Sequence, residues 1–216
     1  MLALNIVSLI CLPIICIEGQ KSIIEVVENK TPEKFRGESE PNIISRTEWS
    51  AREQNRPKLA LNGSVSYVIL HHTTKNKCTS RSECIEAMRV VQNFDMDLHD
   101  RIDVSYNFYV GEDGNVYEGR GWDVAGSHTD FYSDRSIGIC FIGDFRKHKP
   151  EPAAIKALED LISYGVTLGK IDPHYHLYAR NQVSDQSKPD SSELTELAKS
   201  LPGGTSYFDK HKYYVS

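Results

Sequence analysis

Two short apolar runs constrain the fold of this chain more than any other feature. Residues 66–72 have the sequence SYVILHH, and residues 136–145 have the sequence SIGICFIGDF. Both runs are nearly continuous in apolar residues and rich in β-branched or aromatic side chains, which is typical of buried strands. Between them, YNFYV and NVYEG flank the turn sequence GEDG and predict a hairpin. The chain is therefore expected to contain a central sheet.

Helical periodicity separates these strands. Residues 82–99 carry an apolar residue at every third or fourth position, and this stripe predicts an amphipathic helix. The stripe consists of Ile85, Met88, Val91, Phe94 and Leu98. A central sheet with helices packed on it places the chain in the α/β class.

Two further helices are predicted after the last strand. One begins at Glu151-Pro152 and ends at Gly169, and the other follows Asp190 as its N-cap and ends at Pro202-Gly203. Their expected buried faces are Ile155, Leu158, Ile162 and Val166 in the first, and Leu194, Leu197 and Leu201 in the second.

The length of 216 residues suffices for one domain of about 150–170 residues with extra segments. The first 19 residues are apolar with no acidic side chain before Glu18, which favours a secretion signal cleaved near Gly19. A signal anchor and a buried helix are the alternatives, although Pro13 interrupts the run. The predicted divisions are a signal peptide at 1–19, a flexible extension at 20–42, a folded domain at 43–204 and a tail at 205–216.

The cysteines and sequons fit an extracellular chain. Cys78 and Cys84 are separated by five residues, which favours a local disulfide over two thiols. Cys140 lies in an apolar run and is expected to be a buried thiol that forms no disulfide. Asn29 and Asn62 begin glycosylation sequons. The net charge of −5 argues against a nucleic-acid partner.

Several side chains of the middle region suit a ligand made of sugar and peptide. Such a ligand needs aromatic faces for apolar contact and donors for carboxylates and amides. The residues that supply both kinds of contact are Tyr106, Asn107, Arg120, Trp122 and His128. Structural roles are the alternative: Tyr106 in the core, and Arg120 in an ion pair with Asp123 or Glu118.

Seven short motifs occur in a fixed order along the chain. They are ISRTEW at 44–49, VILHHT at 68–73, the Cys78 and Cys84 pair, SYNF at 105–108, GNVYEGRGW at 114–122, GSHT at 126–129 and SIGICFIG at 136–143. Together they resemble the peptidoglycan recognition protein family, which is related to the zinc N-acetylmuramoyl-L-alanine amidases of bacteriophage type. The resemblance spans about residues 43–202.

The resemblance implies a fold and a ligand. The fold is a single α/β domain with a mixed central β-sheet flanked by helices and a long groove on one face. The ligand is the muramyl peptide of bacterial peptidoglycan. The groove is expected where His71, Tyr106 and the loop after Gly119 converge. The expected ligand-binding residues are His71, Tyr106, Asn107, Arg120, Gly121, Trp122, His128 and Arg180.

The zinc ligands of the related amidases are only partly matched. Those enzymes use two His and one Cys, and leave a fourth position for water. The resemblance places His71 at the first ligand position and Tyr106 beside the metal. The other two ligands are expected in a Gly-His-Arg-Gln run and a following Cys-Pro-Gly. This chain has Ala-Arg-Asn-Gln and Lys-Pro-Asp there, so Arg180 replaces the histidine and Lys188 replaces the cysteine.

Neither replacement suits a metal. A guanidinium has no lone pair to give, and an ammonium must lose its proton before it can ligate. We therefore expect no zinc, no cofactor and no hydrolysis. A chelate by His174 and His176 is the alternative, while His72 is expected to face the opposite side of its strand, buried and hydrogen-bonded.

The two introduced cations have two candidate roles. Arg180 and Lys188 would bind an anionic stem peptide, or they would pair with acidic neighbours at the surface. The neighbours are Asp185, Asp190 and Glu193. In the family, a Gly-Trp pair is associated with diaminopimelate-type peptidoglycan, so Gly121-Trp122 leans toward that type over the lysine type without deciding between them.

Three functional hypotheses follow. The first is a secreted, non-catalytic pattern-recognition receptor of innate immunity that binds peptidoglycan and acts with immune signalling proteins. The second is an active zinc amidase with a rearranged site. The third is a regulator that binds other family members rather than peptidoglycan.

Overall fold

The computed structural model describes residues 40–54, 56–75, 77–184 and 191–205. The strands are β1 (Ile43–Ile44), β2 (Val65–His72), β3 (Phe108–Val110), β4 (Val116–Glu118), β5 (Ser136–Phe141) and β6 (Ile171–Ala179). The helices are α1 (Arg81–Asn93), the π-helical turn η2 (Phe94–Leu98), α2 (Pro152–Thr167), α3 (Arg180–Val183) and α4 (Ser192–Ser200). No helix within the described ranges is both long and apolar enough to cross a bilayer.

Several predicted features lie outside the described residues. They are the signal peptide, Asn29, most of the predicted extension, the side chains of Asp185, Lys188 and Asp190, and nearly all of the tail.

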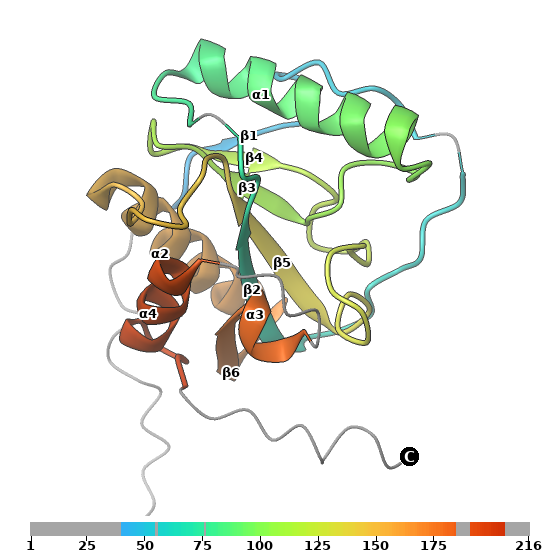
Figure 1. Cartoon of the computed structure of the whole chain (residues 1–216). Helices are drawn as coiled ribbons and strands as arrows, with labels where there is room; N and C mark the ends of the chain where they lie inside the picture. Colours follow the sequence, from blue (N-terminus) through green and yellow to red (C-terminus); the bar gives the residue numbers. More distant parts are fainter. Residues whose placement is uncertain (1–39, 55, 76, 185–190, 206–216) are drawn as a thin grey trace, which may run out of the picture. The chain divides into compact units, whose positions relative to one another are not determined.

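The six strands form one mixed sheet in the order β1-β4-β3-β5-β2-β6 (Figure 1). Strand β2 lies between β5 and β6 and runs parallel to both. Strand β3 is parallel to β5 and antiparallel to β4, so the predicted hairpin is present. The predicted class, α/β with a mixed central sheet and flanking helices, is confirmed.

Alternation along the strands divides the apolar side chains between two faces of the sheet. Val68 and Leu70 of β2 pack with Leu158 of α2 on one face, which α4 also covers. Met88 of α1 packs with Tyr109 of β3 on the other face. Figure 1 shows α1 on one side of the sheet and the pair α2 and α4 on the other. Each face therefore has its own core.

The helix predicted over residues 82–99 is present, and its expected buried face is confirmed in part, because Met88 is buried and Ile85 and Val91 are partly buried against the core. Cys84 and Met88 are the fully buried apolar residues of α1, and the disulfide holds Cys84 in the core. After α1 the chain continues as the π-helical turn η2, in which Asp95 is buried. Phe94 and Leu98 are 40% and 73% exposed instead of lying in the core.

The second predicted helix is confirmed as α2, which has Pro152 at its start and is followed by Gly169 at φ +67°. The third is α4. Its N-cap is Ser191, whose hydroxyl accepts from the backbone N–H of Leu194 at 3.0 Å, so the expected capping by Asp190 is wrong.

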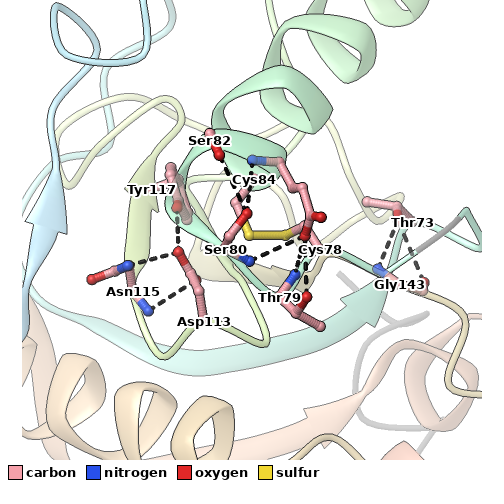
Figure 2. Close-up of a disulfide and its surroundings, with 11 residues drawn as sticks. Thr73, Cys78, Thr79, Ser80, Ser82, Cys84, Asp113, Asn115, Tyr117 and Gly143 are labelled. Atoms are coloured by element: carbon pink, nitrogen blue, oxygen red, sulfur yellow. Dashed lines mark hydrogen bonds between the residues drawn. A yellow bond between two sulfur atoms is a disulfide. The ribbon is translucent and has the colours of Figure 1, made fainter.

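The predicted disulfide joins Cys78 and Cys84 and closes the loop that leads into α1 (Figure 2). Directly after it, Ser80 and Glu83 form a reciprocal capping box at the helix N-terminus. Cys140 is buried, as predicted, and its thiol donates to the carbonyl of Phe141 at 3.7 Å. The disulfide therefore anchors the start of α1 against the sheet.

Replacing both bridged cysteines, Cys78→Ser with Cys84→Ser, is expected to lower the free energy of unfolding by about 2 kcal/mol, because the unfolded chain regains the freedom of the small loop. Urea unfolding followed by circular dichroism measures this. The matched control is wild-type protein whose thiols are blocked under native conditions, which leaves the disulfide intact. An unchanged unfolding midpoint in the double variant would contradict the expectation.

Candidate functional site

A pocket of about 310 Å³ opens at the carboxyl ends of the parallel strands β2 and β5. His71 and Thr73 line it at the end of β2, and Cys140 lines it from β5. One wall comes from α1 and η2, and Arg180 lines the pocket from the start of α3. Crevices at the carboxyl ends of strands are the usual ligand sites of open α/β sheets.

Three aromatic rings form a stack along the pocket. Tyr106 lies between His71 and His128, with centroid distances of 5.6 and 5.3 Å and interplanar angles of 14°. The hydroxyl of Tyr106 makes a hydrogen bond of 2.5 Å with Nδ1 of His71. The hydrogen bond fixes the orientation of the histidine ring at the mouth of the stack.

His128 forms the inner end of the stack and is 6% exposed. Its Nδ1 lies 3.0 Å from the hydroxyl of Thr129, while its Nε2 is buried without a hydrogen-bond partner among the described residues. The ring lies directly over Gly138, where any Cβ would collide with it. Burial, and then the positive charge of Arg120, lower the pKa of His128 to about 3. The ring is therefore neutral at physiological pH.

Arg180 enters the pocket through the register of β6. Leu70 pairs with Ala179, so the next residues, His71 and Arg180, reach the same end of the two strands. The Nε of Arg180 is buried and has no hydrogen-bond partner within the described residues. A ligand oxygen at this position would satisfy a buried, charged donor.

Charged side chains that sequence analysis did not identify complete the pocket. Lys75 lies over the ring of Phe94, with its Nζ 5.4 Å from the centroid. Arg101 lies with its Nε 3.7 Å from Asp95, whose carboxylate also accepts from the Ser105 hydroxyl at 2.7 Å. Together with Arg180, these cations outnumber the single carboxylate among the described lining residues.

Asn107 is fully buried and does not line the pocket. Its amide donates to the carbonyls of Gly121 and Val124, both at 2.9 Å, and its oxygen accepts from the backbone N–H of Gly138 at 2.9 Å. All these contacts tie the loop after β4 to β5. The structure therefore places Asn107 in a structural role, contrary to the expected ligand contact.

Arg120 is also buried away from the pocket. Its guanidinium donates to the carbonyl of Val104 at 2.6 Å and to that of Ala125 at 2.9 Å. The alternative ion pair is wrong too: among the described residues Arg120 pairs with neither Asp123 nor Glu118, and Asp123 pairs with Lys170 at 2.5 Å. Arg120 holds two backbone segments together rather than meeting a ligand.

The side chain of Trp122 lies on the opposite side of the sheet from His71, and neither Gly121 nor Trp122 lines the pocket. The indole packs on Phe108 with a centroid distance of 4.4 Å, as part of the core beneath α2. Its ring fills the space beside Gly165, where a Cβ would come within 2.7 Å of it. The sequence-based preference for diaminopimelate-type peptidoglycan rested on this pair. The pocket therefore gives that preference no support.

The residues at the pocket do not fit a three-ligand zinc site. His71 offers an imidazole, but Arg180 has no lone pair, and Lys188 lies outside the described residues. No group of three His, Cys, Asp or Glu side chains suited to a metal occurs in the described part of the chain.

The other histidines do not restore such a site. His176 stacks on Tyr67, which is four residues before His71 on β2, and His174 is exposed; neither lines the pocket. His72 is buried on the other face of β2, and its Nδ1 accepts from the backbone N–H of Phe145 at 3.1 Å, as predicted.

The family model, the similar sequences and the similar solved structures all indicate the same family. The family described as N-acetylmuramoyl-L-alanine amidase matches residues 61–193. Human peptidoglycan recognition protein 3 is 42% identical over 69% of this chain and 43% of its own length, so the chain spans less than half of that relative. Drosophila melanogaster peptidoglycan-recognition protein SC2 is 38% identical over 72% of this chain and 84% of its own length.

Solved structures agree with these sequence relatives. Drosophila peptidoglycan recognition protein LB superposes with a TM-score of 0.74 at 36% identity, over 78% of this chain and 99% of that one. Peptidoglycan recognition protein LE, solved with tracheal cytotoxin, a monomeric diaminopimelic acid-type peptidoglycan, gives 0.73 at 34% identity, over 79% and 98%.

The buried, neutral His128 predicts a pH dependence of stability. Its folded pKa of about 3 lies below the ordinary value of 6.5, so the unfolded state binds the proton more tightly. The contribution of this group is complete above about pH 6.5 and is lost as the pH falls toward 3, by up to about 1.4 kcal/mol per pH unit. Urea unfolding between about pH 7 and pH 4 measures the slope.

The variant His128→Gln is expected to remove this part of the slope. The matched control is His174→Gln, since His174 is exposed. Equal slopes for wild type and both variants would mean that His128 does not titrate as its burial requires.

Proposed function

The chain belongs to the peptidoglycan recognition protein family, and from that membership we propose that it binds the muramyl peptide of bacterial peptidoglycan as a secreted pattern-recognition receptor without amidase activity. The observation that carries the proposal is the placement of Arg180 beside the ring stack of His71, Tyr106 and His128. This arrangement keeps the means to hold a sugar-peptide ligand and lacks a set of metal donors.

The pocket suits the two halves of such a ligand. The ring stack and the apolar wall of Val90 and Phe94 offer surface for the sugar and the aliphatic parts of the peptide. Arg180 and Lys75 offer cations for stem carboxylates. The relative LE, solved with a monomeric peptidoglycan, supports this choice of ligand.

The positive charge in the pocket opposes zinc binding and, with it, amidase activity. Arg180 carries a fixed positive charge in the pocket, and the family resemblance aligns Lys188, which lies outside the described residues, with the cysteine ligand of the related amidases. Two unit charges about 4 Å apart repel by about 4 kcal/mol at an effective dielectric near 20, and zinc is doubly charged. When bound in related amidases, zinc supplies an activated water. The single imidazole of His71 would have to hold such an ion against the charge of Arg180.

Secretion and glycosylation belong to the same proposal. The disulfide of Cys78 and Cys84 is of the kind that persists in oxidising compartments. Asn62 lies exposed before Gly63, in a loop that a glycan could reach. Mass spectrometry of protein from the medium of expressing eukaryotic cells tests both points, through the mature N-terminus and the mass at Asn62. Intact, cell-retained chain would reject secretion.

One partner class is also part of the proposal. The ectodomains of peptidoglycan recognition proteins LCa and LCx were solved as a complex with tracheal cytotoxin. We therefore expect that a partner of this chain, if it has one among proteins, is another member of the family bound in the presence of the muramyl peptide. Mixing with family ectodomains, with and without the ligand, tests this by size-exclusion chromatography.

The central experiment measures three properties on one preparation: co-sedimentation with insoluble peptidoglycan, metal content, and release of stem peptide. We expect binding without stoichiometric zinc and without release. Stoichiometric zinc with cleavage would establish the amidase alternative. Failure to bind both diaminopimelate-type and lysine-type peptidoglycan, together with binding to another family member, would establish the regulator alternative.

Reversing the charge at the pocket, Arg180→Glu, is expected to weaken muramyl peptide binding by roughly 10- to 100-fold, because a buried charge-assisted contact becomes a repulsion. Isothermal titration with soluble muramyl peptide measures the affinity. Lys58→Glu is the matched control, since it makes the same change in net charge at an exposed position outside the pocket. Equal losses in both variants would place the ligand elsewhere.

The double change Arg180→His with Lys188→Cys is expected to create zinc affinity, because by the family resemblance it restores the histidine and the cysteine that complete the zinc site of the related amidases. Metal content after dialysis measures this, and each single variant serves as a control. Zinc retained equally by wild type would show that the native side chains already suffice.

A further inference from the structure

Arg180 reaches the pocket from α3, which is a single helical turn at the end of β6 (Figure 1). The backbone N–H of Ser184 donates to the carbonyl of Arg180 at 2.9 Å and closes the turn. So short a helix does not hold itself, because fixing the backbone of its first turn costs more than the first hydrogen bonds return. The direction of Arg180 therefore depends on the side chains that hold α3 in place.

The backbone at the outer edge of β6 prepares the place of one such side chain. β6 is the last strand of the sheet, and the chain that returns after α4 lies along its outer edge. Leu177 pairs there with Gly204 in parallel, and the N–H of Leu177 donates to the carbonyl of Gly203 at 2.8 Å. In a parallel ladder these bonds recur at every second residue. The next one would join the N–H of Ala179 to the carbonyl of Thr205.

The side-chain amide of Gln182 occupies this position in the ladder. Its Oε1 accepts from the N–H of Ala179 at 2.9 Å, and its Nε2 donates to the carbonyl of Thr205 at 3.0 Å. The amide thus stands between two backbone groups that a regular ladder would join directly, and it satisfies both of them. The inserted amide separates the returning chain from β6 at the point where α3 begins.

Other side chains of α3 hold the turn at different places. The Oδ1 of Asn181 accepts from the hydroxyl of Thr195 in α4 at 3.0 Å, and Val183 is buried in the core. These contacts fix the middle and the end of the turn. The bond from Gln182 to the end of β6 acts directly before Arg180, where the turn begins.

The guanidinium of Arg180 depends on this support. The side chain is half-buried, and its Nε makes no hydrogen bond within the described ranges. An arginine side chain is long, so a small rotation of the peptide before it displaces the guanidinium much further. Recognition of a ligand requires that the contacting group be held to within about 0.5 Å.

We propose that Gln182 is a positioning residue, which acts on the ligand through Arg180. Its amide fixes the N–H of Ala179 and thereby sets the direction from which the Arg180 side chain enters the pocket. The bond to Thr205 fixes the amide from its other side. Gln182 affects muramyl peptide binding only if the pocket is the site of that ligand, so this inference rests on the proposed function.

The test is a double-mutant cycle measured by isothermal titration with soluble muramyl peptide. Gln182→Met keeps the length of the side chain and removes the amide, and it is expected to weaken binding by roughly 3- to 10-fold, as couplings between neighbouring residues do. In the Arg180→Gln background the same change is expected to have no further effect, because the residue through which it acts is gone. An equal loss in both backgrounds would overturn the proposal.

Two further variants guard against a merely structural effect. Asn181→Ala is the matched control on the same turn, since it removes the contact with α4 and leaves the inserted amide intact. It is expected to change affinity by less than about 2-fold, and a loss as large as that of Gln182→Met would overturn the proposal. Gln182→Asn, whose shorter amide cannot reach both backbone groups, is expected to act like Gln182→Met and replaces it in the cycle if that variant does not fold.

Hydrogen exchange of the Nε–H of Arg180, followed by NMR, needs no ligand. The resonance is assigned by its loss in Arg180→Gln. Because this group is buried, its exchange with water is slow while the side chain keeps its place. Gln182→Met is expected to speed the exchange by roughly 10-fold, and Asn181→Ala is expected to speed it less. Unchanged exchange in Gln182→Met would overturn the positioning role.

Exchange and affinity together separate two failures. If wild type does not bind muramyl peptide while Gln182→Met still speeds the exchange, the proposed function fails and the positioning of Arg180 stands. If wild type binds and Gln182→Met changes neither value, the positioning role fails and the proposed function stands.

Discussion

The parallel pairing of β2 with both of its neighbours is the constraint on which the site depends. It sets His71 opposite Cys140 and brings Arg180, just past the end of β6, to the same edge of the sheet. Alternation then sends His71 to the pocket and His72 to the opposite core. A shift of one residue in this register would exchange the two histidines and leave the ring stack without its outer member.

Buried polar side chains also determine the site, because they bond the backbone segments around the pocket. Asn107 satisfies three backbone groups, and Arg120 satisfies two, in a region where loops rather than regular strands surround the pocket. Each unmet backbone group there would cost about 1–3 kcal/mol, so side chains that look suited to a ligand serve the scaffold instead. Asn107 acts on the pocket indirectly, because it holds Gly138 of β5, over which the ring of His128 lies.

Sequence patterns predicted the strands that are buried on both faces, because such strands have continuous apolar runs. They also predicted the helix α2, because its buried face recurs as an apolar stripe. They missed β6, an edge strand with exposed histidines and Pro173, because edge strands need neither continuous apolarity nor alternation. Of the expected ligand-binding residues, His71, Tyr106, His128 and Arg180 line the pocket, and their contact with a ligand stays a prediction. The resemblance could not reveal Asp95 or Arg101, because a π-helical turn and an irregular loop deliver them without any periodicity.

Under the proposed function, exchanging a metal donor for a guanidinium changes which state of the ligand the pocket favours. A metal site stabilises charge that develops during hydrolysis, whereas Arg180 attracts carboxylates that are present before and after binding. Interactions of equal strength in the bound ligand and any transition state improve affinity without accelerating chemistry. The intact ring stack and the fixed cation would therefore act toward the same end, a ligand that is held and left uncleaved. For a receptor, slow release of an intact ligand is the useful property, since affinity among related complexes is set mainly by the rate of dissociation.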